Sequence, residues 1–587
     1  MKSTRILLAF LAAAATLAAD PIDKSAADID TTRGFRWGEL GPSTQAIDLG
    51  AYAAVRYVNR AASAGPADGS RQRPWPDLRT ALENAPAGKR TAVLVASGTY
   101  EATALALRGG VDLFGGYDAA DWSREIFRHP TILRGTGADR ILVGADDCAL
   151  DGFVIEQGVS RGHGGAILCD GTSPRITNNV FRNNRTAEPP DHPHGLKRRR
   201  VRGWDGGAIA LLNGASAEIR NNVFFANETG IGYGGAINAA HDCLPAIVSN
   251  VFWGNRAGVD DRNVTRSGNG GAVGLIFSSH AALVHNLFVA NATLGKGDGG
   301  AVFMEYFCWP EVARNAFLGN RAEDDGGGID HQKLSYPKIR ANLFYGNRAG
   351  KSGGGVHSDD SSAELENNLF AYNRAAKQGG GVGGTHSWAR LLNNTLVFNE
   401  ATQNGGAIHF VNVKNPFFRP PVLRNNLMAL NNPGQVHFDS EAETAYNIMH
   451  PGGYKEGYYN RDAPPGFVED GRSLTAGAVR HDERAFVTTI AVAETLVPES
   501  LAGRVVRVGD HWSLVRSNTG RALEIWGPPP PAGAVEILPT LHLAADSRAI
   551  SAGTHPEFPL FDIDGDLRQY PAIDVGADAF RGTPAPR

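Results

Sequence analysis

The chain has 587 residues, of which 42% are hydrophobic and 20% are charged, and its formal net charge at pH 7 is −4. Near-equal numbers of acidic and basic residues argue against nucleic acid as the partner. Only four cysteines serve this length, so we expect that disulfides do not hold the fold together, and the 72 glycines indicate many tight turns.

The N-terminal end is typical of a secretory signal. Residues 1–5 carry two basic side chains, residues 6–15 are apolar, and Ala18 and Ala19 offer a small-residue cleavage site. The apolar run is too short to span a bilayer, and no later segment is long enough. The sequence therefore predicts a signal peptide over residues 1–19, no transmembrane segment, and export to the periplasm, the cell surface or the medium.

Residues 20–110 are predicted to form an N-terminal segment and a cap. An amphipathic helix over residues 76–82, followed by an apolar strand over residues 92–96, would cover the open end of the repeats that come next. Such a cap is needed because the first strand of a stacked array otherwise exposes unpaired backbone groups.

Nine Gly-Gly pairs then mark a repeat. Six of the eight spacings between them are 26–29 residues, and the other two are 42 and 36. This period is too short for two helices with their loops, and the intervening segments alternate between apolar and polar residues. We therefore predict one coil of a parallel β-helix per repeat, over residues 111–455. The pairs begin at Gly164, Gly206, Gly234, Gly270, Gly299, Gly326, Gly353, Gly379 and Gly405.

Aligned repeats give columns of identical side chains. A buried ladder of Asn at about 4.8 Å spacing would pass hydrogen bonds from coil to coil, and stacked Phe rings would fill the core. We interpret these columns as structural. The first Asn column is Asn179, Asn222, Asn250, Asn286, Asn315, Asn342, Asn368, Asn394 and Asn426. A second Asn column lies five residues later, from Asn184 to Asn431, and the Phe column is Phe181, Phe224, Phe252, Phe288, Phe317, Phe344 and Phe370.

Outward positions of the strand after each Gly-Gly turn do not repeat, so these positions can carry function. Polar and ionisable residues concentrate there in the middle and later coils, whereas Leu, Ala and Gly prevail earlier. Neighbouring coils would bring Asp330 against His357, and such contacts shift pKa values. The alternative is an ordinary solvated sheet face. The predicted catalytic residues are Glu305, Asp330, His357, Asp359 and His409, with His331 and Lys333 beside them.

Two expectations follow from alternation along these strands. Strict alternation would point His331 inward, which weakens it as a candidate. Outward polar residues contribute little to stacking, so we expect Asp330→Asn and His357→Ala to lower turnover while leaving the melting temperature nearly unchanged.

Basic and aromatic residues near this face are candidates for substrate binding. A basic insertion before Gly206 would clamp an anionic sugar or form a solvated loop, and the Arg that follows the second Asn column would bind carboxylates or pair with nearby acids. Both alternatives stay open. The candidates are Arg198, Arg199, Arg200, Arg321, Arg348, Arg374, His241, Tyr306, His386 and Trp388.

The period fades after Asn431. Residues 456–587 are predicted to form a C-terminal β region, with a small β insert over residues 488–526 and a return to the solenoid at residues 562–578.

The coils and the ends together resemble the secreted bacterial right-handed parallel β-helix proteins, the architecture of pectate lyases, chondroitinase B-like lyases and polygalacturonases. The resemblance covers residues 57–587 and implies an all-β fold that binds extracellular polysaccharide. Chondroitinase B-like lyases pair a Lys base with an Arg beside calcium-binding acids. Lys333 with Glu305, Asp359 and Asp360 is the nearest counterpart, although Asp360 stands where that Arg would be. Calcium is thus one open alternative.

Two functions remain from the sequence. The first is a lyase or hydrolase acting on an acidic glycan, in which Lys333, His357 or His331 would take a proton, or Glu305 and Asp359 would act as a carboxyl pair. The second is a non-catalytic surface or glycan-binding solenoid, which would bind a ligand without turning it over. The short motifs at residues 206–209 and 224–227 resemble those of polymorphic outer-membrane proteins, which are adhesins. The sequence decides neither between these functions nor the oligomeric state.

Overall fold

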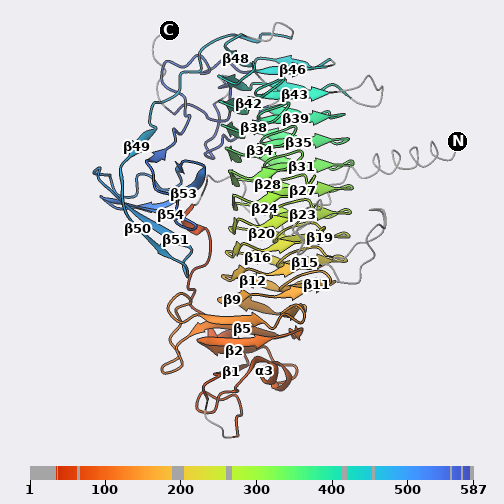
Figure 1. Cartoon of the computed structure of the whole chain (residues 1–587), viewed down its shortest axis with the longest axis vertical. Helices are drawn as coiled ribbons and strands as arrows, with labels where there is room; N and C mark the ends of the chain where they lie inside the picture. Colours follow the sequence, from red (N-terminus) through yellow and green to blue (C-terminus); the bar gives the residue numbers. More distant parts are fainter. Residues whose placement is uncertain are drawn as a thin grey trace, which may run out of the picture.

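Each repeat folds into one coil that contains four short strands. In the computed structural model, one coil runs through β11 (Ile167–Asp170), β12 (Arg175–Thr177), β13 (Val180–Arg182) and β14 (Arg185–Thr186), and β15 (Ile209–Leu212) begins the next. Equivalent strands of successive coils pair in parallel along the long axis (Figure 1). The predicted all-β, right-handed parallel β-helix is confirmed. The structure describes residues 35, 37–62, 66–187, 204–258, 268–411, 419–439, 441–452, 457–554, 558–569 and 573–581.

Four parallel sheets form the faces of the solenoid in the described chain. Sheet A extends from β1 (Ala54–Val58) to β47 (Glu443–Ala445), and sheet B from β3 (Gly98–Ala102) to β48 (Ile448–His450). Sheet C extends from β4 (Leu105–Ala106) to β46 (Val436–Phe438), and sheet D from β10 (Val159–Ser160) to β42 (Glu400–Ala401). Sheet C carries the candidate site. Its other strands are β7 (Leu142–Val143), β11, β15, β19 (Ile237–Ala240), β23 (Val273–Ile276), β27 (Val302–Glu305), β31 (Ile329–Gln332), β35 (Val356–Asp359), β39 (Val382–Thr385) and β43 (Ile408–Val411).

The predicted ladders set the register of the coils. The Phe rings lie fully buried in one column, with neighbouring centroids 4.6–4.9 Å apart and planes within 7°. The side-chain oxygen of Asn342 accepts hydrogen bonds from both the backbone and the amide nitrogens of Asn315, at 2.9 and 3.0 Å. This pattern recurs along both Asn columns, and the first column continues beyond the prediction to Asn447 and Asn460. Both ladders are therefore confirmed.

Each Gly-Gly pair is required by its turn. The first glycine has a positive φ, as at Gly326 (+67°), and a Cβ on the second would collide with the next coil, as at Gly207, where it would lie 2.1 Å from the carbonyl oxygen of Gly235. The four cysteines are free thiols buried in the solenoid. Stacked strands and backbone turns, not disulfides, hold the coils together.

The N-terminal region caps the solenoid and then contributes strands to it. Helix α3 (Leu78–Asn84) begins at the N-cap Asp77, whose side chain accepts a hydrogen bond from the backbone of Thr80. Strands β1 to β4, which include β2 (Thr91–Ala96), pair in parallel with later coils. Two 3-10 turns, η1 (Trp37–Glu39) and η2 (Leu49–Ala51), precede them. The segment after η1 follows the corner between sheets A and B, where the backbone nitrogen of Gly41 donates to Ser249.

The C-terminal region forms an antiparallel sheet beside the solenoid (Figure 1). The ring of Trp512 packs directly on sheet B, since a Cβ at Gly346 would lie 2.3 Å from it. The predicted β insert is thus confirmed, although its strands extend further in both directions. They are β49 (Arg472–Leu474), β50 (Ala476–Asp482), β51 (Val487–Val492), β52 (Val505–Val508), β53 (His511–Asn518), β54 (Ala522–Trp526) and β55 (Val535–Ile537).

The described part of the C-terminal tail does not return to the solenoid as a further coil, contrary to expectation. It lies along the corner between sheets A and B, where the side-chain amide of Asn393 donates to Asp574 at 2.9 Å and the backbone of Gly576 donates to Asn425 at 2.8 Å. Buried polar groups in the turns between sheets A and B require hydrogen-bond partners, and residues of the C-terminal tail provide them. None of the described helices combines the length and apolarity needed to span a bilayer.

Candidate functional site

Two columns of side chains point outward from the strands of sheet C, in the predicted register. On β31 the sequence Ile329, Asp330, His331, Gln332 alternates inward and outward, so Asp330 belongs to the first outward column and Gln332 to the second. The first column also holds Phe303, His357, Gly383 and His409. The second also holds Glu305, Asp359, Thr385 and Val411.

The first outward column is buried, so it is neither the substrate-facing surface predicted from the sequence nor the solvated sheet face given as the alternative. Asp330, His357 and His409 are 0%, 3% and 1% exposed. The reason is that each Gly-Gly turn folds back over the strand that follows it. A Cβ at Gly326 would lie 2.6 Å from the Cβ of Asp330, and one at Gly353 would lie 2.6 Å from that of His357. The expectation of an unchanged melting temperature on substitution assumed that these side chains are solvent-exposed, and that assumption is wrong.

Asp330 and His357 form a buried ion pair. His357 Nδ1 lies 2.8 Å from Asp330 Oδ2, which confirms the predicted contact. Burial by itself would lower the pKa of His357. The nearby carboxylates of Asp325 and Asp330 have the larger, opposite effect, so the pKa of His357 is raised. Burial raises the pKa of Asp330, and the hydrogen bond from His357 limits that rise. This pair connects β31 to β35 below the surface, away from any polymer in solution.

His331 lies inside the solenoid, as alternation indicates. Its side chain is 0% exposed, and Nδ1 lies 2.9 Å from the hydroxyl of Ser361. Burial lowers the pKa of His331 to about 3, so the ring is neutral at ordinary pH. No substrate can reach it in this structure.

The second outward column and the turn after it form a half-exposed group, here called the polar cluster. Lys333 Nζ lies 3.6 Å from Asp359 and 3.5 Å from Asp360, and His386 Nδ1 lies 3.0 Å from Asp360. Burial lowers the pKa of Lys333, but the two carboxylates outweigh it and the net change is upward. The lysine is therefore a fixed cation and a poor base at neutral pH. The polar cluster comprises Glu305, Lys333, Asp359, Asp360 and His386.

Glu305 is a partly buried carboxyl of the polar cluster. It ends β27, and the hydroxyl of Tyr233 donates to its Oε2 at 3.3 Å. Burial raises the pKa of Glu305, although Tyr233 and Lys333 oppose this. The register places Gln332 on the coil between Glu305 and Asp359. A carboxyl with a raised pKa thus lies two coils from a carboxylate that pairs with a lysine.

Aromatic side chains occupy the same turns. His241, Phe277 and Tyr306 stack with centroids 5.0 Å apart and planes within 4°, so this row presents ring edges, and Tyr306 is 37% exposed. A second row, here called the aromatic ridge, has centroids 5.7–6.1 Å apart and planes tilted by 30–58°. Because its rings are tilted, they do not cover one another's faces. The aromatic ridge consists of His280, Trp309, Tyr336 and Trp388.

Sequence reasoning found Tyr306, Trp388, His241 and His386 but missed the other members of the two aromatic rows and Tyr233, which contacts Glu305. Each residue of the aromatic ridge stands two positions before a strand of sheet A, such as β28 (Glu311–Ala313) or β32 (Lys338–Arg340). That constant offset is a signal in the sequence that could have found them. The missed residues are Tyr233, Phe277, His280, Trp309 and Tyr336.

The arginine row lies on sheet D and pairs with acids, which favours the second of its two interpretations. Arg321 pairs with Glu323 at 2.8 Å, and Arg374 with Glu400 at 3.1 Å. Arg348 pairs at 2.6 Å with Asp510, which belongs to the antiparallel region. Arg198, Arg199 and Arg200 lie outside the described residues.

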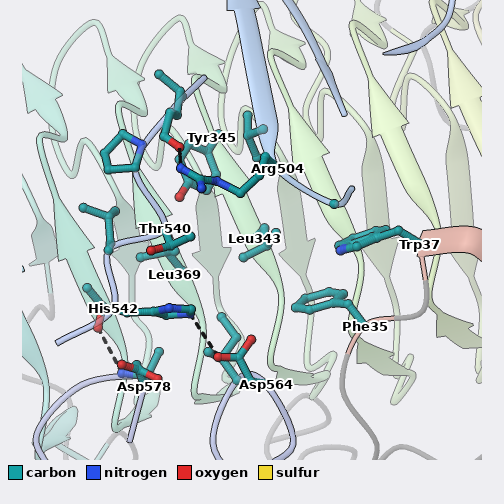
Figure 2. A pocket seen from close by; sticks show the side chains of 18 of the residues that line it. Phe35, Trp37, Leu343, Tyr345, Leu369, Arg504, Thr540, His542, Asp564 and Asp578 are labelled. Carbon is teal, nitrogen blue, oxygen red and sulfur yellow. Dashed lines mark hydrogen bonds and ion pairs between the residues drawn. The ribbon is translucent and has the colours of Figure 1, made fainter. Parts of the chain in front are cut away.

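A separate pocket of about 300 Å³ lies between sheet B, the antiparallel region and both ends of the described chain (Figure 2). Phe35 and Trp37 line it together with His542, whose Nε2 is 3.1 Å from Asp564. The hydrogen bond to Asp564 raises the pKa of His542, and burial raises that of Asp578 to about 6. Sequence reasoning missed this pocket, because its walls come from opposite ends of the chain.

Several groups of side chains have the composition of a metal site in the described chain. One combines Asp359, Asp360 and His386, but both of its carboxylates already form ion pairs with Lys333. Another combines Asp298 with Asp324 and Asp325, and Lys351 Nζ binds Asp324 at 2.6 Å. In these two groups a lysine supplies the positive charge, and a role for calcium stays a prediction.

A family model described as a protein of unknown function (DUF1565) matches residues 62–274, just over one third of the chain. None of the curated proteins compared with the chain matches its sequence.

Among solved structures, the mannuronan C-5 epimerase AlgE6 A-module of Azotobacter vinelandii is 12% identical, with 70% of this chain and 100% of that one covered and a TM-score of 0.32. XylC in complex with xylose is 10% identical, with 83% and 98% covered and a TM-score of 0.35. The AlgE4 A-module of A. vinelandii is 12% identical, with 66% and 95% covered and a TM-score of 0.26. These scores support no inference about activity.

Proposed function

We propose that this chain is an exported glycoside hydrolase that binds a polysaccharide across the aromatic ridge and cleaves it at the polar cluster. The observation that carries the proposal is that Glu305 and Asp359 end β27 and β35, directly before the row of turns along which the aromatic ridge runs.

The aromatic ridge suits a chain of sugar rings. The apolar face of a pyranose packs on an aromatic ring, while Tyr and Trp also bring a polar group to the contact. The ridge spans consecutive coils, with a gap at Ser362 across which Tyr336 and Trp388 approach to 5.9 Å. An extended polymer could therefore run parallel to the solenoid axis and contact several rings at once.

The carboxyl pair suits hydrolysis with inversion of configuration. Glu305 and Asp359 are two coils apart, which corresponds to a strand separation of about 9.5 Å, near the upper end of the spacing that leaves room for a water molecule. The raised pKa of Glu305 fits the acid that protonates the leaving oxygen. The Asp359 carboxylate would accept a proton from the attacking water, and Gln332 lies between them to orient that water.

The structure favours hydrolysis over elimination. Two of the three bases considered for a lyase, His331 and His357, are buried, and Lys333 is held protonated by two carboxylates. Acids also outnumber cations in the polar cluster. This charge favours a neutral glycan over the acidic glycan expected from the sequence, since an anionic polymer would be repelled.

The test is an assay of the purified mature chain on a panel of neutral and uronate-containing polysaccharides, with and without calcium. New reducing ends on a neutral polymer, without the ultraviolet absorbance of unsaturated ends, support the proposal. Unsaturated ends would show a lyase. Binding without any cleavage would show the second candidate, a glycan-binding surface protein, which the same aromatic ridge would serve.

A further inference from the structure

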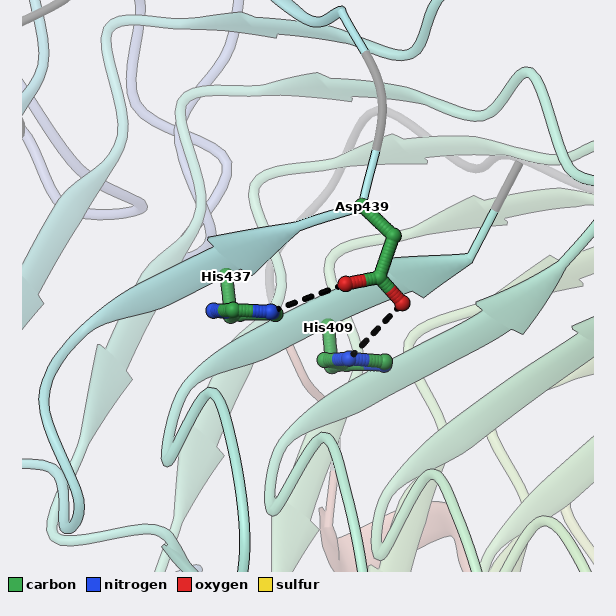
Figure 3. Close-up of side chains that lie close together, drawn as sticks. All are labelled: His409, His437 and Asp439. Carbon is green, nitrogen blue, oxygen red and sulfur yellow. Dashed lines mark hydrogen bonds and ion pairs between the residues drawn. The ribbon is translucent and has the colours of Figure 1, made fainter. Parts of the chain in front are cut away.

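A group of two histidines and one aspartate lies on the last two strands of sheet C, apart from the polar cluster. His409 is on β43, His437 is paired with it on β46, and Asp439 follows β46 (Figure 3). The two imidazole rings stack with centroids 5.2 Å apart and planes within 2°. Both turn Nε2 toward one carboxylate, at 2.9 Å from His437 to Oδ1 and 3.9 Å from His409 to Oδ2.

The buried member of this group lacks a hydrogen bond. His409 is 1% exposed, and its Nε2 has no hydrogen-bond partner within the described chain. The 3.9 Å approach of Asp439 is too long to count as one. Buried polar atoms without a partner are rare in folded proteins. An unpaired imidazole nitrogen that faces a carboxylate, beside a second imidazole whose Nε2 faces the same carboxylate, is instead typical of a metal ligand.

We infer that His409, His437 and Asp439 bind a divalent transition-metal ion, with zinc as the best match. Imidazole nitrogen and carboxylate oxygen are common zinc ligands, and three protein ligands leave a position for water or another ligand. The three donor atoms lie within 4.8 Å of one another. Bonds of about 2.0–2.2 Å place the ligands of one zinc about 3–4 Å apart. Binding therefore draws the exposed side chains of His437 and Asp439 toward the buried His409.

The position of the group indicates what the metal does. Strand β46 is the terminal strand of sheet C in the described chain, and its residues are only half-buried. A terminal strand exposes unpaired backbone groups and frays more readily than an internal one. A metal shared by β43 and β46 would fasten this end of the solenoid. The role is separate from glycan cleavage, whose proposed residues lie on earlier coils.

The experiment titrates Zn²⁺ into the EDTA-treated full chain by isothermal calorimetry. The variants are His437→Ala and Asp439→Asn, whose exposed positions should leave folding intact. His450→Ala is the matched control, because His450 pairs with Asp462 at 2.8 Å in the same way but without a second histidine. We expect one site in the parent chain and in the control, and at least tenfold weaker affinity in the other two variants.

A second readout locates the effect on the structure. Zinc should slow amide hydrogen exchange in residues 436–438 and raise the melting temperature of the parent chain and of His450→Ala, but not of His437→Ala. No binding by the parent chain, unchanged affinity in His437→Ala, or equal loss in the control would overturn the assignment.

Discussion

Two columns of side chains leave the same strands of sheet C in the same direction, yet only one reaches solvent. Asp330 and His357 lie beneath the Gly-Gly turns and are almost wholly buried, whereas Glu305 and Asp359, one alternation further along their strands, stay half-exposed. Alternation decides the direction of a side chain, and the neighbouring turn decides its exposure. The difference separates a structural ion pair from a group that can meet a substrate.

The largest stability effect should come from breaking the buried column. We expect His357→Ala to lower the free energy of unfolding by about 3–5 kcal/mol, because it leaves the Asp330 carboxylate buried without its partner. Asp359→Asn, in the half-exposed column, should cost less than about 1 kcal/mol. Denaturant unfolding of both variants checks this, and a small loss in His357→Ala would show that the column is solvated after all.

The same pair should make stability depend on alkaline pH. The pKa of His357 is raised in the folded state, so its contribution is fully present below its ordinary pKa of about 6.5 and is lost as pH rises through the raised value. We expect a loss on the order of 2 kcal/mol between about pH 6.5 and 9.5. Thermal unfolding over this range should show a weaker dependence in His357→Gln, and equal slopes would contradict the pairing.

On the exposed side of the comparison, Trp388→Ala should weaken glycan binding by about tenfold, or about 1.4 kcal/mol, through loss of one stacking surface. Tyr458→Ala is a matched control, since Tyr458 is 78% exposed and lies outside the aromatic ridge. Calorimetry on a bound polysaccharide measures both variants. Equal affinity in the two would remove the ridge from the binding surface.

The smallest effect is expected from the arginine row. Arg374→Ala should change the free energy of unfolding by less than about 0.5 kcal/mol and leave glycan affinity unchanged, because its exposed side chain pairs with Glu400. A tenfold loss of affinity would instead restore this row as a substrate-binding surface.

Features that recur in every coil could be predicted from the sequence, whereas the exposure of a side chain and contacts between distant segments could not. The columns of Asn342 and Phe344, the contact of Asp330 with His357, and the inward position of His331 all follow from period and alternation. Exposure of the first column depends on how the turn at Gly326 folds back, which alternation does not report. The pocket beside Trp37 is lined by segments far apart in the sequence, so no local sequence pattern predicts it.

The most direct test of the proposed chemistry is turnover by Glu305→Gln, measured with its melting temperature and its affinity for the same polysaccharide. The proposal predicts a loss of turnover of about 10²–10⁴-fold, with affinity and melting temperature nearly unchanged, because the variant removes the proton donor and keeps the shape of the side chain. Full turnover in Glu305→Gln would contradict the proposal and place the chemistry elsewhere on the molecule.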